Sequence, residues 1–451
     1  MNVILTNKAD FYPLHLPILQ FDPEDDCGVI TDDLSFPPLA SPIIYSLELT
    51  PSCNNRCSGC SNVFISDKDT RLMMPVRRPM PLASWEVILD KIAPFAQRLK
   101  LTGGEATSYP EFDRLLAALR TRNLSFTLFT NGRWKDPEQI IELLKQTPQC
   151  LGLLISLHGA DAEAHEAFTG VKGSFEETIR NIRLAADAGL TVHTNAVFTR
   201  YNAGQIKELV GLSHSLGANC AVFNRYVGTP VPDLALSPLA LMKAVREVDR
   251  VNEQGKKTKL STCVPLCFVE SSSTGCLAGT AYCTIDPWGN VRPCNHAPQM
   301  AGNLLHQSLD SVWRSSTMQA WRDLIPDECS TCSAFSTCHG GCRADMVLKG
   351  VKRDPLMTIP LPLYESPKPQ PRRLELYESA IPRLDYTLQE EAFGPVLIQG
   401  NDIIPISPRA RSILGAMNQQ DTLRRFEDKF GEEAINFIGQ LYDRGAVSLS
   451  W

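Results

Sequence analysis

The sequence lacks any long apolar run. None approaches the roughly 18 consecutive residues that a membrane-spanning helix requires, so no such helix is predicted. A signal-peptide core is also missing, because Asn7, Lys8 and Asp10 break the short apolar runs between Met1 and Leu19. We therefore expect no export and a cytoplasmic location. Nor is there an excess of basic residues: the net charge of -6 offers no electrostatic footprint for nucleic acid.

Cysteine, in contrast, is abundant, with 15 among 451 residues. In an exported chain this number would suggest disulfides, but here the cysteines gather at metal-ligand spacings without an export signal. The sequence therefore predicts reduced thiolates in a cytosolic metalloenzyme. The length allows two or three domains, and the apolar and charged fractions, 43% and 21%, are those of a globular protein.

Three cysteines lie on one short loop, Cys53-Asn-Asn-Arg-Cys57-Ser-Gly-Cys60, directly after an apolar, strand-like segment. Three thiolates at this spacing can hold three irons of a [4Fe–4S] cube, and the fourth iron stays open because no fourth cysteine lies nearby. A zinc knuckle or unrelated cysteines are the alternatives, but zinc usually closes its site with four ligands and a CxxC pair at each end. The loop therefore predicts a cluster with one open iron.

This CxxxCxxC spacing resembles the signature of radical S-adenosylmethionine (SAM) enzymes. The resemblance implies that the amino and carboxylate groups of SAM chelate the open iron, and that an electron from the cluster cleaves SAM to a 5′-deoxyadenosyl radical. Two residues depart from the family pattern: Gly59 stands where an aromatic residue near adenine is usual, and Ala106 where proline is usual. We expect adenine to find its apolar contact elsewhere, with Val63 and Phe64 as candidates.

Strand-like runs alternate with amphipathic helical stretches over residues 40–255, after an N-terminal extension of residues 1–39. Such a repeat builds a parallel sheet, and six units suit an α/β fold, a partial (β/α)6 TIM-like barrel, which is the architecture typical of radical SAM enzymes. In such barrels functional residues gather at the C-terminal ends of strands. The predicted strands are Ile44–Leu49, Leu99–Thr102, Phe126–Thr130, Leu151–Leu157, Thr191–Thr199 and Cys220–Val227.

The end of the second predicted strand carries candidate SAM contacts. Gly103 and Gly104 lack side chains, which lets a backbone approach a ligand closely, and Glu105 adds an acceptor for an ammonium group. Alone, a Gly-Gly-Glu run is most often just a turn. One βα unit after the cysteine loop, it resembles the family's GGE motif, which binds the amino group of SAM.

Later strands carry three further candidates. By the family resemblance Ser156, at the end of the fourth strand, contacts the ribose of SAM, and Asn195 on the fifth strand is a further candidate for cofactor binding. Ordinary hydrogen bonding at the sheet end is the alternative for both, and for Asn195 it is about as good an explanation. His158 is a candidate catalytic base, although a lone histidine near a strand end is more often structural.

A cysteine-rich segment follows, over residues 256–354. Cys276 precedes Gly289 and Cys294, and the turn residues around Gly289 predict a hairpin that lets the two cysteines meet. Cys283 lies in this hairpin and is predicted to be a core thiol rather than a redox residue. Four more cysteines come at metal-ligand spacing: Cys329, Cys332, Cys338 and Cys342. A double zinc ribbon is the structural alternative.

The order and spacing of these cysteines resemble the SPASM extension of radical SAM enzymes that modify peptides and proteins. The resemblance implies one or two auxiliary iron–sulfur clusters. The ligands implied for the first are Cys276, Cys294 and Cys342, with Cys267 as the fourth and Cys263 as its substitute; those implied for the second are Cys329, Cys332 and Cys338. The family's seventh cysteine is missing, because none occurs after Cys342. The second cluster is therefore open, lost, or completed by an oxygen or nitrogen ligand such as Asp345, Asp354 or His339.

Residues 355–379 are proline-rich and predict a semi-rigid linker. Residues 380–451 predict a small winged-helix domain. Its expected strands are Arg383–Leu388, Val396–Gln399, Asp402–Ile406 and Ala446–Ser450, and its expected helices are Pro408–Met417, with Ser407 as N-cap, Thr422–Phe430 and Glu432–Arg444, which Gly445 ends.

This domain resembles the PqqD-like peptide-recognition element of ribosomal peptide biosynthesis, in which a leader peptide adds a strand to an exposed sheet edge. DNA binding is the alternative for a winged helix, but acidic residues outnumber basic ones from Ala380 onward. The sequence thus indicates an enzyme that modifies a ribosomally made precursor peptide by hydrogen abstraction, with ferredoxin or flavodoxin as reductant and with neither nucleic acid nor membrane as partner. The alternatives are maturation of a folded protein, of sulfatase or quinone-cofactor type, and a non-catalytic iron–sulfur DNA-binding regulator.

Overall fold

A computed structural model describes residues 38–62, 78–228, 231, 234–260, 264–269, 275–332, 335–358, 378–399, 402–406, 410–417 and 420–451. The chain divides into two compact units. The larger comprises Ser41–Cys329 and Cys338–Pro362, and the smaller contains Leu363–Trp451 with Met1–Ala40 and Ser330–Thr337. The barrel segment and most of the cysteine-rich segment therefore share one unit.

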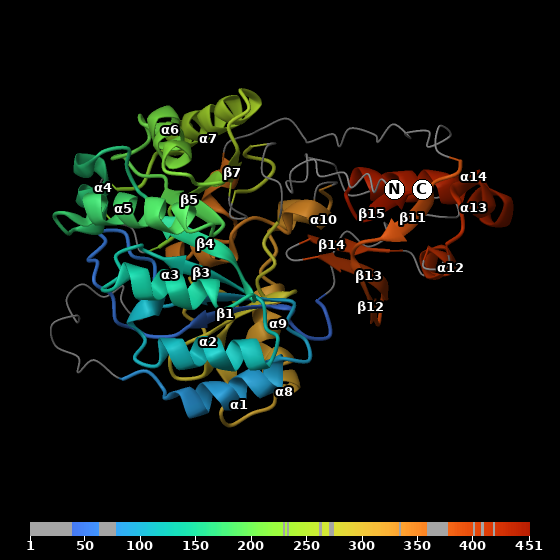
Figure 1. Cartoon of the computed structure of the whole chain (residues 1–451), viewed down its shortest axis with the longest axis horizontal. Coiled ribbons are helices and arrows are strands. Elements are labelled where there is room, and N and C mark those ends of the chain that lie inside the picture. Colours follow the sequence, from blue (N-terminus) through green and yellow to red (C-terminus); the bar gives the residue numbers. More distant parts are fainter. Residues whose placement is uncertain are drawn as a thin grey trace. The chain divides into compact units, whose positions relative to one another are not determined.

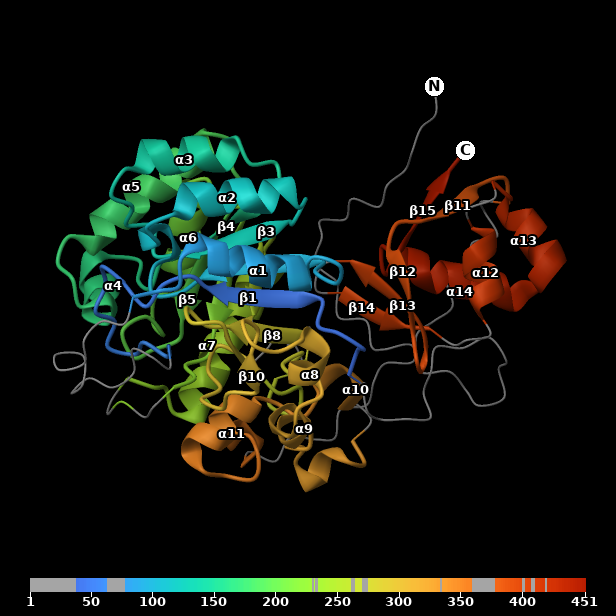
Figure 2. The ribbon, with the colours of Figure 1, turned by 90° about the horizontal axis from the view of Figure 1, so that it is seen from below.

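The larger unit is built on a ten-stranded sheet with the strand order β10-β9-β8-β1-β2-β3-β4-β5-β6-β7 (Figures 1 and 2). Neighbours from β8 through β1 to β7 pair in parallel, as an α/β barrel requires. The six predicted strands are confirmed to within three residues, and β7 and β8 extend the sheet. The bounds are β1 (Ile44–Glu48), β2 (Arg98–Thr102), β3 (Phe126–Thr130), β4 (Cys150–Ser156), β5 (Val192–Val197), β6 (Cys220–Asn224) and β7 (Thr258–Leu260).

Helices connect these strands and lie against the sheet (Figure 1). Their apolar residues recur every three or four positions; in α2, for example, Phe112, Leu115 and Leu119 are buried. In β2 the buried Leu99 and Leu101 alternate with half-buried polar residues, so one face of the strand packs on the helices. The bounds are α1 (Leu82–Ile92), α2 (Phe112–Thr121), α3 (Pro137–Lys145), α4 (Ala162–Thr169), α5 (Ser174–Asp187), α6 (Ile206–Ser215) and α7 (Pro238–Glu253). Among the described residues, no helix is long and apolar enough to cross a membrane.

The cysteine-rich segment continues the sheet through the predicted hairpin. β8 (Tyr282–Ile285) pairs with β1 and, antiparallel, with β9 (Asn290–Arg292), and Gly289 makes the turn at φ +83°. Cys283 is fully buried in the core, which confirms its predicted place there. The remaining elements are β10 (Gly302–Asn303), α8 (Leu309–Trp313), α9 (Ser316–Arg322), α10 (Phe335–Cys338) and α11 (Arg343–Lys349).

The smaller unit contains a three-stranded antiparallel sheet, β12-β13-β14, a two-stranded sheet, β11-β15, and three helices. The single strand predicted over Arg383–Leu388 is wrong: the chain leaves β11 after Leu384, Tyr386 turns into the core, and β12 begins at Thr387. The three predicted helices are confirmed. Ser407 and Pro408, at the predicted start of the first, lie outside the described residues. The bounds are β11 (Ile381–Leu384), β12 (Thr387–Glu391), β13 (Gly394–Gln399), β14 (Asp402–Pro405), α12 (Arg411–Ala416), α13 (Leu423–Phe430), α14 (Glu432–Asp443) and β15 (Val447–Ser450).

Candidate functional site

The loop after β1 carries Cys53, Cys57 and Cys60, with the first exposed and the others half-buried. A turn closes the second half of the loop, where the Cys60 amide donates to the Cys57 carbonyl at 3.3 Å. None of these three cysteines is in a disulfide. Partial burial of its sulfur raises the pKa of Cys53 to about 11, and the nearby Glu105 and Cys60 add to this rise. A thiol of this kind becomes a thiolate when a metal ion takes the place of its proton.

Two glycines at the end of β2 bring the chain against the cysteine loop. A β-carbon on Gly104 would lie 2.2 Å from the Ser52 carbonyl oxygen, and one on Gly103 would lie 2.6 Å from that of Thr50. The Gly104 amide donates to the Thr50 carbonyl at 2.6 Å, and the Glu105 amide to that of Ser52 at 2.7 Å. The two glycines therefore allow the end of β2 to pack closely against the cysteine loop of the same chain.

Glu105 is 1% exposed, and its carboxylate is held by several donors. Oε1 accepts from the hydroxyls of Thr107 and Thr130 at 2.8 and 2.7 Å, and Oε2 accepts from the Asn131 amide at 2.8 Å. Burial raises the pKa of this carboxyl, and these hydrogen bonds oppose the rise. The carboxylate thus links the ends of β2 and β3 below the cysteine loop. Contact between Glu105 and the SAM ammonium stays a prediction.

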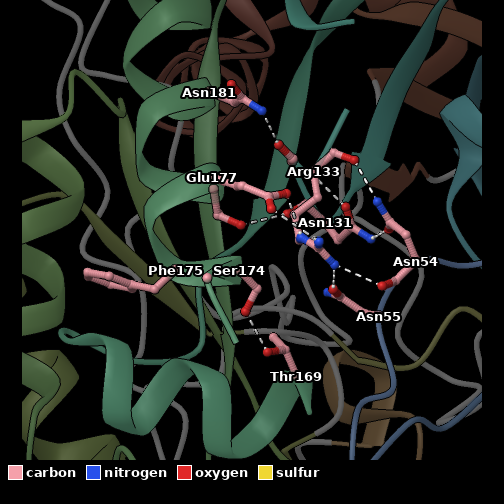
Figure 3. A network of polar contacts seen from close by, with 12 residues as sticks. Asn54, Asn55, Asn131, Arg133, Thr169, Ser174, Phe175, Glu177 and Asn181 are labelled. Atoms are coloured by element: carbon pink, nitrogen blue, oxygen red, sulfur yellow. Dashed lines mark hydrogen bonds and ion pairs between the residues drawn. The ribbon is translucent and has the colours of Figure 1, made fainter. Parts of the chain in front are cut away.

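A polar network from the loop after β3 holds the first part of the cysteine loop (Figure 3). Asn131 Nδ2 donates to Asn54 Oδ1 at 2.7 Å and reaches Cys53 Sγ at 3.7 Å. Arg133 Nη1 donates to the Asn54 carbonyl and to Asn55 Oδ1, both at 2.8 Å, while its Nε binds Glu177 at 2.8 Å. Sequence reasoning missed these residues. The available signal was the polar run after the third predicted strand, at the functional end of the barrel.

The second part of the cysteine loop lies against the end of α4. The amides of Arg56 and Ser58 donate to the carbonyls of Thr169 and Phe168, each at 2.8 Å. A β-carbon on Gly59 would meet Leu234 at 2.5 Å and Tyr226 at 2.9 Å. Neighbouring side chains therefore fill the space that an aromatic residue at position 59 would need, which explains this departure from the family pattern. Val63 and Phe64, the expected adenine contacts, lie outside the described residues.

Ser156 and Asn195 are register partners at the ends of β4 and β5, and both are half-buried. Asn195 also accepts a hydrogen bond from Asn224 of β6. His158 is 6% exposed, with its ring centroid 4.1 Å from that of Phe168. Burial, with the nearby His165, lowers the pKa of His158 to about 3, so the imidazole is neutral at physiological pH. These contacts favour the structural role of His158. The SAM contacts of Ser156 and Asn195 stay predictions.

The structure brings three of the auxiliary-site cysteines together. Cys294 and Cys342 are buried, Cys276 is half-buried, and all three pack in one small cluster of side chains. Burial raises the pKa of Cys294, and the thiols of Cys276 and Cys342 raise it further. Cys267 is half-buried in the segment 264–269, and Cys263 lies outside the described residues.

The cysteines assigned to a second auxiliary cluster are Cys329, Cys332 and Cys338. Cys329 and Cys338 are buried, Cys332 is half-buried, and Cys338 Sγ accepts from the Leu266 amide at 3.5 Å. Two of the suggested oxygen ligands are engaged elsewhere. Asp354 and Asp345 both bind the buried Arg225 of the loop after β6, at 2.8 and 2.5 Å.

A second buried ion pair supports both cysteine sites. Glu48, at the end of β1, binds Arg292 of β9 and accepts from Asn295 Nδ2 at 3.0 Å. Burial raises the pKa of Glu48, and Arg292 opposes the rise. Glu48 precedes the cysteine loop and Asn295 follows Cys294, so this contact connects both cysteine sites to the end of β1.

Among the described residues, no three His, Cys, Asp or Glu side chains are arranged to hold a single metal ion. A cube-shaped cluster offers a different iron to each thiolate, so its ligands need not converge on one point. The buried guanidinium of Arg343, beside Cys276 and Cys342, fits an anionic cluster at the auxiliary site. The three thiols of the loop after β1, against which Gly103 and Gly104 pack, fit the cluster that binds SAM.

Comparison with known proteins matches two segments of this chain to known domains. Residues 47–212 match the Radical SAM superfamily, and residues 276–339 match the SPASM iron–sulfur cluster-binding domain. The AdoMet-dependent heme synthase of Methanosarcina barkeri is 26% identical over 332 residues, 67% of this chain and 92% of that protein. Mycofactocin maturase MftC of Mycobacterium ulcerans is 27% identical over 332 residues, 70% and 87% of the respective chains. Streptococcus suis SuiB, solved with its precursor peptide SuiA, shares the fold at a TM-score of 0.59 and 20% identity, over 71% of this chain and 77% of that one.

The protein is therefore a radical SAM enzyme with a SPASM extension. Its cofactors are a [4Fe–4S] cluster with SAM and auxiliary iron–sulfur clusters.

Proposed function

We propose that this enzyme modifies a ribosomally synthesised precursor peptide, and that the smaller unit recognises the leader of that peptide. The proposal rests on the unpaired edges of the three-stranded sheet in this unit. Within the described residues, β12 and β14 each pair on one side only, with β13. Thr387, Leu388 and Glu390 of β12 are exposed. Such an edge offers backbone donors and acceptors to an added strand. The order of elements in this unit, with β11–β14 followed by α12–α14 and β15, also supports the resemblance to PqqD-like domains.

The relatives support the same reading. One similar protein is named as a maturase, and a protein of the same fold has been solved with its precursor peptide. The similarity to heme synthases favours a second candidate, a small tetrapyrrole-like substrate. An open sheet edge can bind a peptide by accepting it as an added strand. We identify no corresponding way in which this edge would bind a small molecule.

The proposed ligands are the cysteines that the family resemblance implies. Cys53, Cys57 and Cys60 hold the cluster that binds SAM, with the Gly103–Glu105 turn, Ser156 and Asn195 around the cofactor. Cys276, Cys294 and Cys342, with Cys267, hold the first auxiliary cluster, and Cys329, Cys332 and Cys338 serve a second. When bound, SAM and its cluster supply a radical that abstracts hydrogen from the peptide. The chain positions the cofactor and shields it from water.

Removing residues 373–451 is expected to separate recognition from chemistry. SAM cleavage without peptide should continue, because the cysteine loop and its supports lie in the larger unit. Turnover of the leader-bearing peptide should fall by roughly 100-fold or more, because tethering no longer raises the concentration of the core segment at the site. The measurement is product formation by mass spectrometry at equal cluster occupancy.

A precursor that lacks its leader provides the matched control, since both enzymes should process it equally slowly. If a short reading frame lies beside this gene, the peptide it encodes is the first substrate to test. Equal turnover of the full precursor by both enzymes would refute leader recognition by this unit. Conversion of a tetrapyrrole by both, without any peptide product, would favour the second candidate.

A further inference from the structure

Arg343 is a buried cation whose donors are incompletely used. It begins α11 directly after Cys342 and is 3% exposed. Its Nε and Nη1 atoms are buried and have no hydrogen-bond partner within the part of the chain that the structure describes. Burying a guanidinium with unused donors is costly unless an anionic group completes the site.

The Cys276 thiol accepts a hydrogen bond from this cation. Burial raises the pKa of the Cys276 thiol, and the charge of Arg343 together with a hydrogen bond from it opposes the rise. Cys342 is the preceding residue, and Cys294 packs in the same cluster of side chains. Arg343 therefore lies beside the cysteines proposed to hold the first auxiliary cluster.

The nearby carboxylates are neutralised by other cations. Asp354 accepts two hydrogen bonds from Arg225 Nη1, at 2.9 and 2.8 Å. Asp345 binds Arg225 Nη2 at 2.5 Å and Lys349 Nζ at 3.0 Å. Asp345 also stands two positions after Arg343 on the helix, a spacing at which side chains do not face each other. These carboxylates therefore do not neutralise Arg343, and its positive charge acts on the neighbouring cysteines.

The same ion network fixes the backbone that carries Arg343. Asp354 Oδ2 accepts from the Cys342 amide at 2.7 Å, and Oδ1 accepts from the Leu356 amide at 2.9 Å. A β-carbon on Gly341 would meet Asp354 at 2.8 Å, so the chain is closely packed here as well. The backbone before Arg343 therefore cannot move without breaking buried contacts.

We propose that Arg343 is the counter-ion of an auxiliary iron–sulfur cluster at Cys276, Cys294 and Cys342, and that its charge and unused N–H donors raise the reduction potential of this cluster. The inference rests on the ligand assignment proposed above. Net charge and hydrogen bonds to sulfur are general determinants of such potentials. A raised potential suits a cluster that accepts an electron. Arg343 is a positioning residue in this role, because it acts on the substrate only through the cluster.

The test is a redox titration of the reconstituted full-length protein, followed by electron paramagnetic resonance. SAM changes the spectrum of the cluster it binds, so the signal that SAM leaves unchanged belongs to an auxiliary cluster. Arg343→Gln should make reduction of this cluster about tenfold less favourable, a shift of about 59 mV to lower potential for one electron. Arg343→Lys, which keeps the charge, should shift it less. The midpoint of the SAM-binding cluster should not move.

Lys352→Gln is the matched control, because it removes a positive charge from an exposed side chain three residues after the end of the same helix. It should leave the auxiliary midpoint in place. Iron content guards against a variant that fails to assemble: loss of the cluster in Arg343→Gln but not in Arg343→Lys would support the counter-ion role. An unchanged midpoint in Arg343→Gln, or loss of the cluster in both variants, would overturn it. Wild-type protein without an auxiliary signal would overturn the ligand assignment as well. Peptide turnover is not part of this test, so its result is independent of the proposed substrate.

Discussion

Cys57→Ala is expected to abolish the release of 5′-deoxyadenosine and methionine from SAM by the reduced, anaerobically reconstituted protein. Cys57 is the middle of the three cysteines on the loop after β1, and a cube held by the two remaining thiolates is unstable. Of the described residues, none of the other cysteines lies on this loop to replace it. Chromatography of the reaction products, with iron counted per chain, measures both losses.

Cys150→Ala is the matched control. Cys150 is a half-buried free cysteine at the first residue of β4, the strand end opposite to the functional one. This variant should cleave SAM at the wild-type rate. Continued cleavage by Cys57→Ala at a comparable rate would show that the loop does not hold the cluster that acts on SAM.

Gly104→Ala is expected to lower SAM cleavage by about 100-fold or more while leaving the fold intact. The new β-carbon would lie 2.2 Å from the Ser52 carbonyl oxygen and 2.7 Å from that of Pro51. Both are backbone atoms, so the cysteine loop itself must move. Displacement of a catalytic group by about an ångström can cost roughly 100-fold in rate. The measurement is the initial rate of 5′-deoxyadenosine formation, with circular dichroism as the check on folding.

Gly204→Ala is the control for this prediction, because nothing lies within 4 Å of the β-carbon it would add. It should match wild-type protein in rate and iron content. Wild-type activity in Gly104→Ala would mean that the contact between the end of β2 and the cysteine loop does not position the cofactor.

The repeating βα pattern predicted the sheet because each strand is marked locally. Leu99 and Leu101 alternate with polar residues in β2, and the helix that follows repeats its apolar residues every three or four positions. The strand predicted over Arg383–Leu388 failed because Tyr386 is apolar enough to continue a strand pattern. Its side chain instead packs into the core at a turn. Periodicity does not distinguish these two uses of a buried tyrosine.

The cysteine sites were predicted from spacing, but the residues that support the cysteine loops were not predicted. Arg133 and Asn54 are 79 positions apart, and Arg225 and Asp354 are 129 apart. Such pairs form only when the sheet brings separate strand ends together, and no local pattern marks them. The role of Gly104 shows the same limit: the sequence predicted a close approach to a ligand, and only the structure shows the approach to Ser52.

The most direct test of peptide modification by this enzyme follows the hydrogen atom that the radical abstracts. The full-length enzyme is reduced, supplied with SAM and given a precursor peptide in which the carbon-bound hydrogens are deuterium. We expect deuterium to appear in 5′-deoxyadenosine and the peptide mass to change in proportion, because the radical takes hydrogen from the peptide. Unlabelled 5′-deoxyadenosine with the peptide mass unchanged would contradict it.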